Sequence, residues 1–256
     1  MDIAKIEEEF KGMAVIVTGG NKGLGYGMAQ ALTEAGCQVV IVGSSEQVHD
    51  TAAQLRAQGG NCQAVRADLR DRAENYRAFR ECLALLHGDL DILATAAGIQ
   101  RRHLPEEFPM EEWDEVLSIN LNSVWIFCQE AGKVMLPKGY GKIINVASMN
   151  SYFGGQTVPA YSAAKGAVVQ LTKALSNDWA GRGINVNAIA PGYMATDLNT
   201  ALLNNPTRMA QITPRIPAGR WGTDQDMKGV TIFLASHASD YLCGAVIPVD
   251  GGYLVK

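Results

Sequence analysis

Short apolar runs alternate along the chain with longer stretches whose apolar residues recur every three or four positions. The short runs are rich in valine, isoleucine and alanine and are mostly bounded by Gly, Asp or Pro, which is typical of β-strands. They lie at residues 13–18, 37–43, 62–67, 91–95, 142–148, 184–190 and 245–250. Because their apolar residues are continuous rather than alternating, we expect burial on both faces, as parallel sheets require.

Helical stretches such as residues 26–36, 46–60 and 110–136 separate these runs. This alternation predicts an α/β fold, a single-domain Rossmann-type doubly wound parallel sheet with right-handed crossovers. No Pro/Ser-rich linker or charge block divides the chain, so residues 1–256 are expected to form one domain. The longest irregular piece, residues 191–222, follows the carboxyl end of a strand, where open α/β sheets bind ligands. It is a candidate lid over a substrate.

Composition excludes several classes of protein. Hydrophobic residues make up 47% and charged residues 19% of the 256 positions, as in an ordinary globular protein rather than a disordered one. A formal net charge of −4 offers no overall attraction to nucleic acid or to an anionic membrane. The N-terminal segment MDIAKIEEEF (1–10) is acidic, and no apolar run is long enough to span a membrane. We therefore expect a cytoplasmic protein with neither kind of partner.

The cysteines indicate reduced core thiols rather than disulfides or a metal site. The five are Cys37, Cys62, Cys82, Cys128 and Cys243. They form no CxxC pair and lie in apolar or helical contexts, which suits a reducing compartment. No structural zinc or other metal is expected.

A glycine-rich stretch, TGGNKGLG (18–25), lies between the first predicted strand and the first predicted helix. Gly19, Gly23 and Gly25 would let the backbone turn tightly and approach a pyrophosphate held at the helix N-terminus. A simple strand-to-helix turn is the alternative. The place of the stretch in the first βαβ unit favours dinucleotide binding.

Tyr161 and Lys165 stand four residues apart with only small side chains between them. The residues that follow carry an apolar stripe at Val168, Leu171, Leu175 and Trp179. On such a helix, positions i and i+4 share a face, so the phenol and the amine can approach one place in space. The same pair also arises by chance on solvated helix faces.

Six motifs in order and spacing resemble those of the short-chain dehydrogenase/reductase family. They are TGGNKGLG, Asp68 in ADLRD, Asn120 in SINLNS, Ser148 in NVASMNS, Tyr161 and Lys165 in YSAAK, and PGYMAT at 191–196. The resemblance covers nearly the whole chain. Within the family, the closest likeness is to sugar-acid members of the 2-dehydro-3-deoxygluconate or gluconate type. It implies an NAD(P)-dependent oxidoreductase that interconverts a secondary alcohol and a ketone.

The resemblance implies a role for each catalytic residue. Tyr161 would be the acid/base, with a pKa that the neighbouring Lys165 ammonium lowers from about 10. Lys165 would also bond the nicotinamide ribose, Ser148 would steady the substrate oxygen, and Asn120 would hold a proton-relaying water. Without the resemblance, the alternative interpretation is that Ser148 caps a helix and that the Asn120 amide only makes structural hydrogen bonds. The cofactor residues implied are Gly19, Asn21, Lys22, Gly23, Leu24, Gly25, Ser44, Ser45, Asp68, Leu69, Ala97, Gly98, Tyr161, Lys165, Pro191, Gly192, Met194 and Thr196.

The chain departs from the family pattern after the fourth predicted strand. Members usually read NNAG there, whereas this chain reads Thr95-Ala96-Ala97-Gly98. Thr95 could keep a hydrogen bond to the sheet, but Ala96 cannot replace an amide. A contact near the cofactor is therefore lost or replaced, although Gly98 still permits close backbone approach.

The choice between NAD and NADP rests on two opposing observations. The second predicted strand ends in Ser44 and Ser45, without the acid that usually holds the ribose 2′-hydroxyl of NAD. These serines and Lys22 could hold a 2′-phosphate, although Lys22 could equally be a solvated lysine. The sugar-acid enzymes that the chain resembles often use NAD. The residues themselves lean towards NADP.

Arg101 and Arg102 follow Gly98 at the rim where nicotinamide and substrate should meet. A guanidinium matches a carboxylate, so one of them could hold the acid end of a keto-sugar acid. The alternative is that both are solvated or pair with Glu106 and Glu107. The full set of candidate substrate residues is Arg101, Arg102, Ser148, Asn150, Gln156, Tyr161 and Tyr193.

Three functions remain open from the sequence. The first is a sugar-acid dehydrogenase, and the second is a reductase of another carbonyl, such as a 3-oxoacyl thioester or a steroid. The third is a catalytically poor nucleotide-binding regulatory protein, suggested by the altered TAAG. The resemblance further implies a homotetramer, which would cover Val246, Leu254 and Val255 of the C-terminal tail. The alternative is that this tail only covers its own sheet edge.

Overall fold

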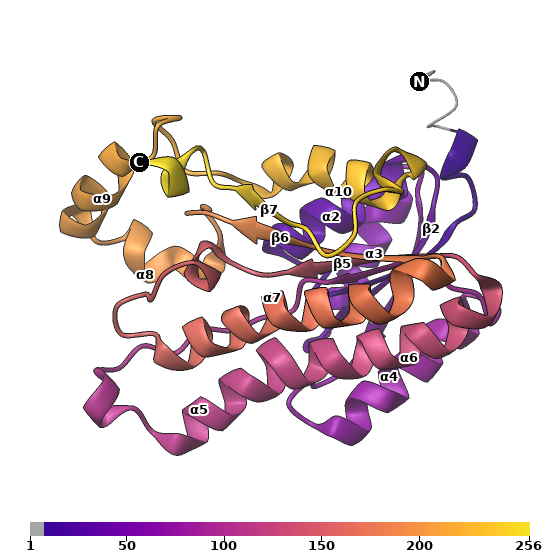
Figure 1. Cartoon of the computed structure of the whole chain (residues 1–256), viewed down its shortest axis with the longest axis horizontal. Coiled ribbons are helices and arrows are strands. Elements are labelled where there is room, and N and C mark those ends of the chain that lie inside the picture. The colour runs from indigo at the N-terminus through magenta and orange to yellow at the C-terminus, as the bar shows by residue number, and fades with distance from the viewer. Residues whose placement is uncertain (1–7) are drawn as a thin grey trace.

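A seven-stranded parallel sheet forms the centre of the molecule (Figure 1). The computed structural model describes residues 8–256, so most of the acidic N-terminal segment lies outside the described residues. The strands stand in the order β3-β2-β1-β4-β5-β6-β7. They are β1 Ala14–Thr18, β2 Gln38–Gly43, β3 Asn61–Arg66, β4 Ile92–Thr95, β5 Gly141–Val146, β6 Ile184–Pro191 and β7 Val246–Val249. All seven predicted strands are present, and the predicted doubly wound Rossmann-type fold is confirmed.

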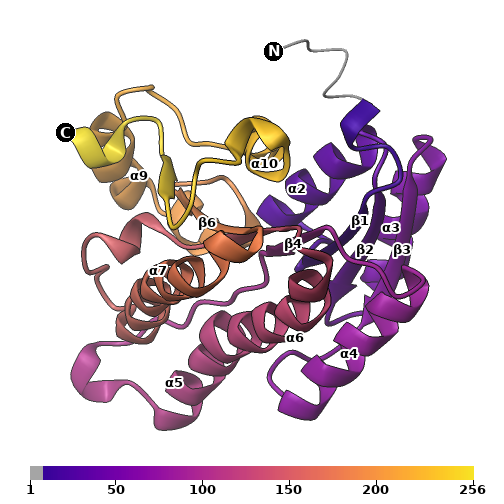
Figure 2. The same cartoon turned by 45° about the vertical axis from the view of Figure 1, so that its right-hand side comes forward.

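Helices cover both faces of the sheet (Figure 2). On one face, α4 (Arg72–Leu85), α6 (Ser123–Lys138) and α7 (Pro159–Trp179) enclose a core that includes Phe79 and Phe127. On the other face, α2 (Gly23–Glu34), α3 (Gln47–Ala57) and α10 (Lys228–Ala235) enclose a second core. The continuous apolar pattern of the central strands follows from this double cover.

The prediction that every strand is buried on both faces is wrong for the two edge strands, β3 and β7. In β3 only Cys62 and Val65 are buried, and no residue of β7 is fully buried. An edge strand has a sheet neighbour on one side only, and the helices cover it incompletely.

The predicted helical stretch 110–136 is interrupted by a π-helical turn. α5 spans Met110–Leu117, the π turn spans Ser118–Asn122, and α6 continues the helix. Asn120 lies within this turn and is fully buried. Such turns widen a helix by one residue and are frequent at functional sites.

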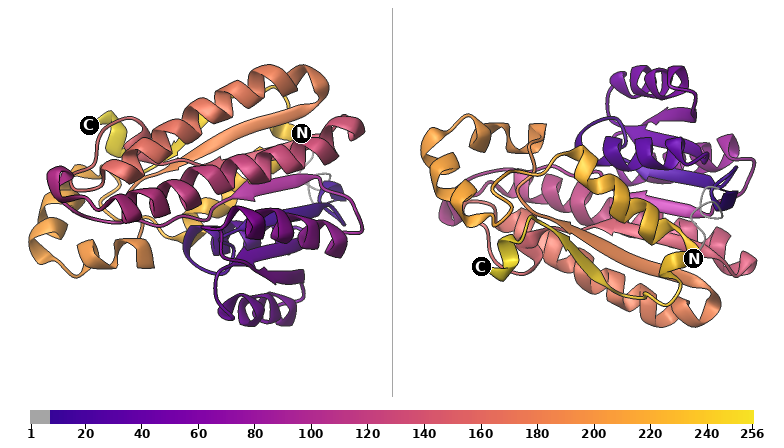
Figure 3. Two further views of the ribbon diagram at one scale, coloured as in Figure 1. Left: turned by 90° about the horizontal axis from the view of Figure 1, so that it is seen from below. Right: turned by 90° about the horizontal axis from the view of Figure 1, so that it is seen from above.

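The segment 191–222, predicted to be irregular, contains short helices. They are η5 (Asp197–Asn199), α8 (Thr200–Leu203), α9 (Pro206–Ile212) and η6 (Thr213–Arg215). Asn205 caps α9 by accepting a hydrogen bond from the Arg208 backbone, and Pro206 occupies the first helical position. Ile212, Ile216 and Trp221 pack with Met149 and Tyr253. Figure 3 shows α8 and α9 extending beyond the carboxyl ends of the strands. We call residues 191–222 the capping segment.

Two details of the surface correct expectations. Cys243 is exposed, whereas the other four cysteines are buried free thiols. Val246 and Leu254 are only partly exposed because they pack on their own chain, and Val255 is the exposed member of the predicted apolar tail. Across residues 8–256 no helix is both long enough and apolar enough to traverse a membrane.

Candidate active site

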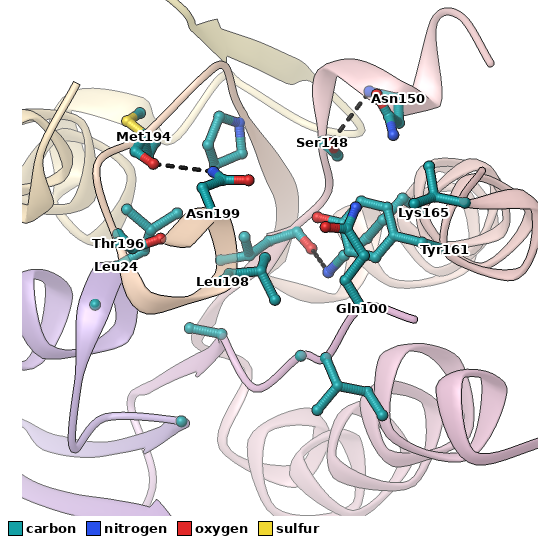
Figure 4. Close-up of a pocket in the computed structure, with 18 of the residues that line it drawn as sticks. Leu24, Gln100, Ser148, Asn150, Tyr161, Lys165, Met194, Thr196, Leu198 and Asn199 are labelled. Carbon is teal, nitrogen blue, oxygen red and sulfur yellow. Dashed lines mark hydrogen bonds between the residues drawn. The ribbon is translucent and has the colours of Figure 1, made fainter. Parts of the chain in front are cut away.

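One cavity of about 940 Å³ opens at the carboxyl ends of the strands (Figure 4). Its walls come from the ends of β1, β2, β4, β5 and β6, from α7, from the capping segment and from the C-terminal turn. Every predicted cofactor residue lines it except Ser45, and every predicted substrate residue lines it. Of the predicted catalytic residues, Ser148, Tyr161 and Lys165 line the cavity, whereas Asn120 lies behind its wall.

The glycine-rich turn leaves space that side chains would fill. Gly19 has a φ of +68°, and a Cβ added there would lie 2.7 Å from the Ala97 backbone. A Cβ on Gly25 would lie 2.2 Å from the Gly19 carbonyl oxygen. α2 begins at Gly23, and its N-cap, Lys22, makes no side-chain cap, so the first-turn N–H groups are available to an anion. This cradle suits the pyrophosphate of a dinucleotide.

The altered TAAG segment is held firmly. The Thr95 hydroxyl donates to Asn145 Oδ1 over 2.8 Å, as predicted for a bond to the sheet. Asn145 in turn donates to the Thr172 hydroxyl over 3.0 Å. Ala96 packs against the glycine-rich turn, where a Cβ on Gly25 would meet it at 3.2 Å. A small residue at position 96 thus matches the tight turn beside it.

Asn120 serves the loop that follows this segment. Its Nδ2 donates to the Ile99 carbonyl over 2.8 Å, and its Oδ1 accepts from the Ile99 N–H over 2.9 Å. Both ends of the amide are therefore committed to one backbone unit. The interpretation of Asn120 as a structurally bonded amide is confirmed for its side chain, which fixes the loop beside Gly98.

Ser148 follows β5 and caps the turn η3 (Met149–Ser151), as the alternative interpretation predicted. Its hydroxyl accepts from the Asn150 N–H over 3.1 Å. Ser151 completes the capping box and donates to the Lys165 carbonyl over 2.7 Å, which ties this turn to α7.

Tyr161 and Lys165 share one face of α7, and both are buried. The Lys165 Nζ lies 5.8 Å from the centroid of the Tyr161 ring and donates to the Val146 carbonyl over 2.6 Å. Burial lowers the pKa of Lys165 from 10.5 to about 8. No carboxylate lies within 4.0 Å of this amine in residues 8–256.

The pKa of Tyr161 differs from the sequence-based expectation. Burial raises it above 10, and a hydrogen bond with Ser148 and the charge of Arg102 oppose this rise. The expected lowering by Lys165 is therefore wrong for the protein alone, because the desolvation of the phenol outweighs its charged surroundings. Arg102 is the cation whose charge counteracts that rise.

The two adjacent arginines have different surroundings. Arg101 pairs with Glu115 at 2.8 Å and approaches Glu112 at 3.8 Å. The alternative prediction, in which the arginines pair with Glu106 and Glu107, is therefore wrong. Arg102 is half-buried and donates to Gln100 Oε1 over 2.7 Å. No carboxylate of the described chain lies within 4.0 Å of Arg102, and burial lowers its pKa.

A cation from β3, Arg66, lies beside the end of β2 and was not identified from the sequence. The Arg66 Nε donates to the Ser44 carbonyl over 3.5 Å, and the Arg66 Nη1 pairs with Glu46 at 2.7 Å. Lys22 forms a looser pair with Asp197 at 3.7 Å, and both side chains are exposed. The parallel pairing of β2 with β3 brings Arg66 here, which local sequence does not indicate.

Also overlooked were Arg208 and Arg215 of the capping segment, both of which line the cavity. A segment predicted to be irregular gave no indication of where its side chains would point. Within residues 8–256, no group of three or more His, Cys, Asp or Glu side chains is arranged to hold a metal ion.

Comparison with known proteins agrees with this arrangement. A family model described as enoyl-(acyl carrier protein) reductase matches residues 19–254. The chain is 44% identical over 247 residues to 2-dehydro-3-deoxy-D-gluconate 5-dehydrogenase of Dickeya dadantii (strain 3937), covering 96% of this chain and 97% of that one. It is 43% identical over 248 residues to the protein of the same name from Bacillus subtilis (strain 168), with 96% of each chain covered.

A solved structure is similar over the whole fold. The crystal structure of a gluconate 5-dehydrogenase from Burkholderia cenocepacia J2315 in complex with NADP and tartrate has a TM-score of 0.92 and 37% identity. The match covers 98% of this chain and 99% of that chain. The chain belongs to the short-chain dehydrogenase/reductase family of NAD(P)-dependent oxidoreductases.

Proposed function

We propose that this protein interconverts a secondary hydroxyl and a ketone on a sugar acid of the gluconate or 2-dehydro-3-deoxygluconate type. One observation carries the proposal: Ser148, Tyr161 and Lys165 line the same cavity as Arg102, a half-buried guanidinium with no carboxylate partner in the described chain. The names of the similar proteins from Dickeya dadantii and Bacillus subtilis support the same substrate class.

The catalytic residues have separate tasks in this proposal. Tyr161 exchanges a proton with the substrate oxygen, and the Ser148 hydroxyl holds that oxygen in place. The nicotinamide cofactor supplies or accepts the hydride. Lys165 bonds the nicotinamide ribose. The Asn120 side chain steadies the loop beside Gly98, which leaves the Asn120 main chain to hold the proton-relaying water.

The nucleotide is held along the rest of the cavity. The glycine-rich turn takes the pyrophosphate, and Asp68, Leu69, Ala97, Gly98 and residues 191–196 line the remaining path. Ser45 does not line the cavity, so Ser44 is the better candidate of the two serines at the end of β2.

Recognition of the acid is the task of Arg102. Its guanidinium is desolvated by the site and has no carboxylate within 4.0 Å among residues 8–256, so a substrate carboxylate would provide the missing counter-charge. Asn150, Gln156 and Tyr193 stand on the same cavity walls as hydroxyl partners. Arg101, already paired with Glu115, supports the loop.

The test is hydride transfer measured by nicotinamide absorbance with a panel of sugar acids, the matching uncharged sugars and a 3-oxoacyl thioester. We expect turnover of the acids. Arg102→Ala should lose at least tenfold in kcat/KM on the acid alone, the scale of one charge-assisted hydrogen bond. Arg101→Ala is the matched control. Equal losses on charged and uncharged substrates would refute recognition of the acid by Arg102, and cofactor binding without turnover would favour a regulatory protein.

The cofactor is proposed to be NADP. The end of β2 lacks an acid, Ser44 and Lys22 line the cavity, and Arg66 contacts the Ser44 carbonyl. Arg66 and Lys22 are paired with the exposed side chains of Glu46 and Asp197, which a 2′-phosphate would displace. The similar protein from Burkholderia cenocepacia is described as a complex with NADP. Comparison of kcat/KM for NADPH and NADH tests this preference, and a higher value for NADH would contradict it.

We further propose that the chain, a single domain, assembles as a homotetramer in the cytoplasm. Trp125 of α6, and Phe233 of α10 together with Tyr241, expose large apolar groups on two separate faces. Two patches could serve two kinds of two-fold interface. Light scattering coupled to size exclusion and cell fractionation test these proposals, and a monomer at micromolar concentration would contradict the assembly.

A further inference from the structure

The substrate end of the cavity carries more positive charge than one carboxylate would balance. Besides Arg102, its walls include Arg208 of α9 and Arg215 of η6. The only side-chain carboxylates that line it in residues 8–256 belong to Asp68 and Asp197, which are paired with Arg70 at 2.6 Å and Lys22 at 3.7 Å. Acidic side chains therefore do not neutralise this end of the site.

The two capping-segment arginines are held by neutral contacts. The Arg215 guanidinium lies 4.6 Å from the centroid of the Tyr253 ring, which is buried and packs edge-on against Tyr193 at 5.2 Å. Arg208 donates to Gln211 Oε1 over 2.8 Å. Neither arginine has a carboxylate within 4.0 Å in the described chain. Stacking and one hydrogen bond orient these cations while leaving donors available.

Arg208 acts on Arg102 through its charge, and both capping-segment arginines act on Tyr193. The charge of Arg208 contributes to the lowered pKa of Arg102, after burial. Arg208 and Arg215 also oppose the raised pKa of Tyr193, which burial dominates. Cations that are close enough to affect these groups repel one another, and a single carboxylate would leave two positive charges unbalanced.

We propose that Arg208 and Arg215 form a second anion-binding position beside Arg102, and that the preferred substrates are sugar acids carrying a second anionic group. This inference rests on the proposed function. The second group is a carboxylate, as in an aldaric acid, or a phosphate, as in an aldonic acid phosphate. Both accept paired hydrogen bonds from guanidinium groups, and a phosphate brings a charge of about −1.5 to −2.

Steady-state kinetics on three matched probes test the second position: an aldonic acid, the aldaric acid of the same length and configuration, and the aldonic acid 6-phosphate. We expect wild-type kcat/KM to be at least tenfold higher for one of the two probes that carry a second anionic group, and the preferred probe identifies that group. Arg208→Gln and Arg215→Gln should each lose about tenfold in kcat/KM on that probe and less than twofold on the aldonic acid.

Two controls separate binding from folding. Arg80→Gln removes an exposed arginine outside the cavity and should leave all three values unchanged. Arg208→Lys and Arg215→Lys keep the charge and should recover part of the preference, while the melting temperature and nucleotide affinity of every variant should match wild type.

The outcomes distinguish the two proposals. Turnover of the aldonic acid without preference for either probe that carries a second anionic group would overturn the second position and leave the proposed function standing. Equal losses of kcat/KM on all three probes in the Gln variants would also overturn the second position. The arginines would then either bind the carboxylate that all three probes share or stabilise the fold of the capping segment. Turnover of none of the three probes would overturn the second position, and the proposed function would fall with it if the wider panel of sugar acids, 2-dehydro-3-deoxygluconate included, also showed no turnover.

Discussion

Replacement of the buried lysine should stabilise the fold while abolishing catalysis. Lys165 is only 3% exposed, and burial lowers its pKa from 10.5 to about 8. That shift corresponds to about 3 kcal/mol of unfavourable free energy for keeping the ammonium in the folded protein at neutral pH. Lys165→Met removes this cost but loses the hydrogen bond to the Val146 carbonyl, worth about 1 kcal/mol.

The net expectation is a gain of about 2 kcal/mol, or a melting temperature about 4 °C higher at pH 7 for a chain of this length. The gain depends on pH. The folded-state pKa lies below the unfolded-state value, so between about pH 8 and 10.5 the unfolded chain binds more protons. Wild-type stability therefore rises with pH in this window, and the advantage of Lys165→Met shrinks.

Differential scanning fluorimetry without added nucleotide, at matched protein concentration and at pH 7 and 10, measures the difference. Lys173→Met is the control, because Lys173 is exposed on the same helix and its replacement should change stability by less than about 0.5 kcal/mol. A Lys165→Met protein that melts below wild type at pH 7 would refute the reasoning. A temperature gap that is the same at both pH values would refute it as well.

Four other changes test the site and the assembly. Tyr161→Phe should lower kcat roughly a hundredfold with unchanged nucleotide affinity, and near-normal turnover would rule out this acid/base. Gly25→Ala would place its Cβ 2.2 Å from the Gly19 carbonyl and should weaken nucleotide binding in a fluorescence titration; Gly166→Ala, in open space on α7, is the control, and equal affinities would show that the turn tolerates a side chain. Ser44→Asp should shift the NADPH/NADH ratio of kcat/KM at least tenfold towards NADH, since a carboxylate there repels a 2′-phosphate; an unchanged ratio would place the discrimination elsewhere. Trp125→Glu should reduce the mass measured by light scattering, and an intact tetramer would show that α6 lies outside the interfaces.

Much of the fold and part of the site could be predicted from local patterns. The strand ending at Thr18, the glycines after it and the pair Tyr161 and Lys165 each depend on residues close together in the chain. Strand periodicity, turn chemistry and the i, i+4 geometry of a helix are local properties, so they can be predicted without knowledge of the tertiary contacts. The capping segment was misjudged because its short helices are stabilised by packing on Met149 and Tyr253, far away in sequence.

The sequence by itself determined the order of strands and helices, the glycine-rich turn and the face shared by Tyr161 and Lys165. Only the tertiary structure decided that Arg101 is paired with Glu115 while Arg102 has no carboxylate partner in the described chain, and that the pKa of Tyr161 is raised. It also brought Arg208 and Arg215 to the same cavity. Charge pairing and desolvation depend on which groups from distant segments come into contact, and local sequence patterns do not indicate those contacts.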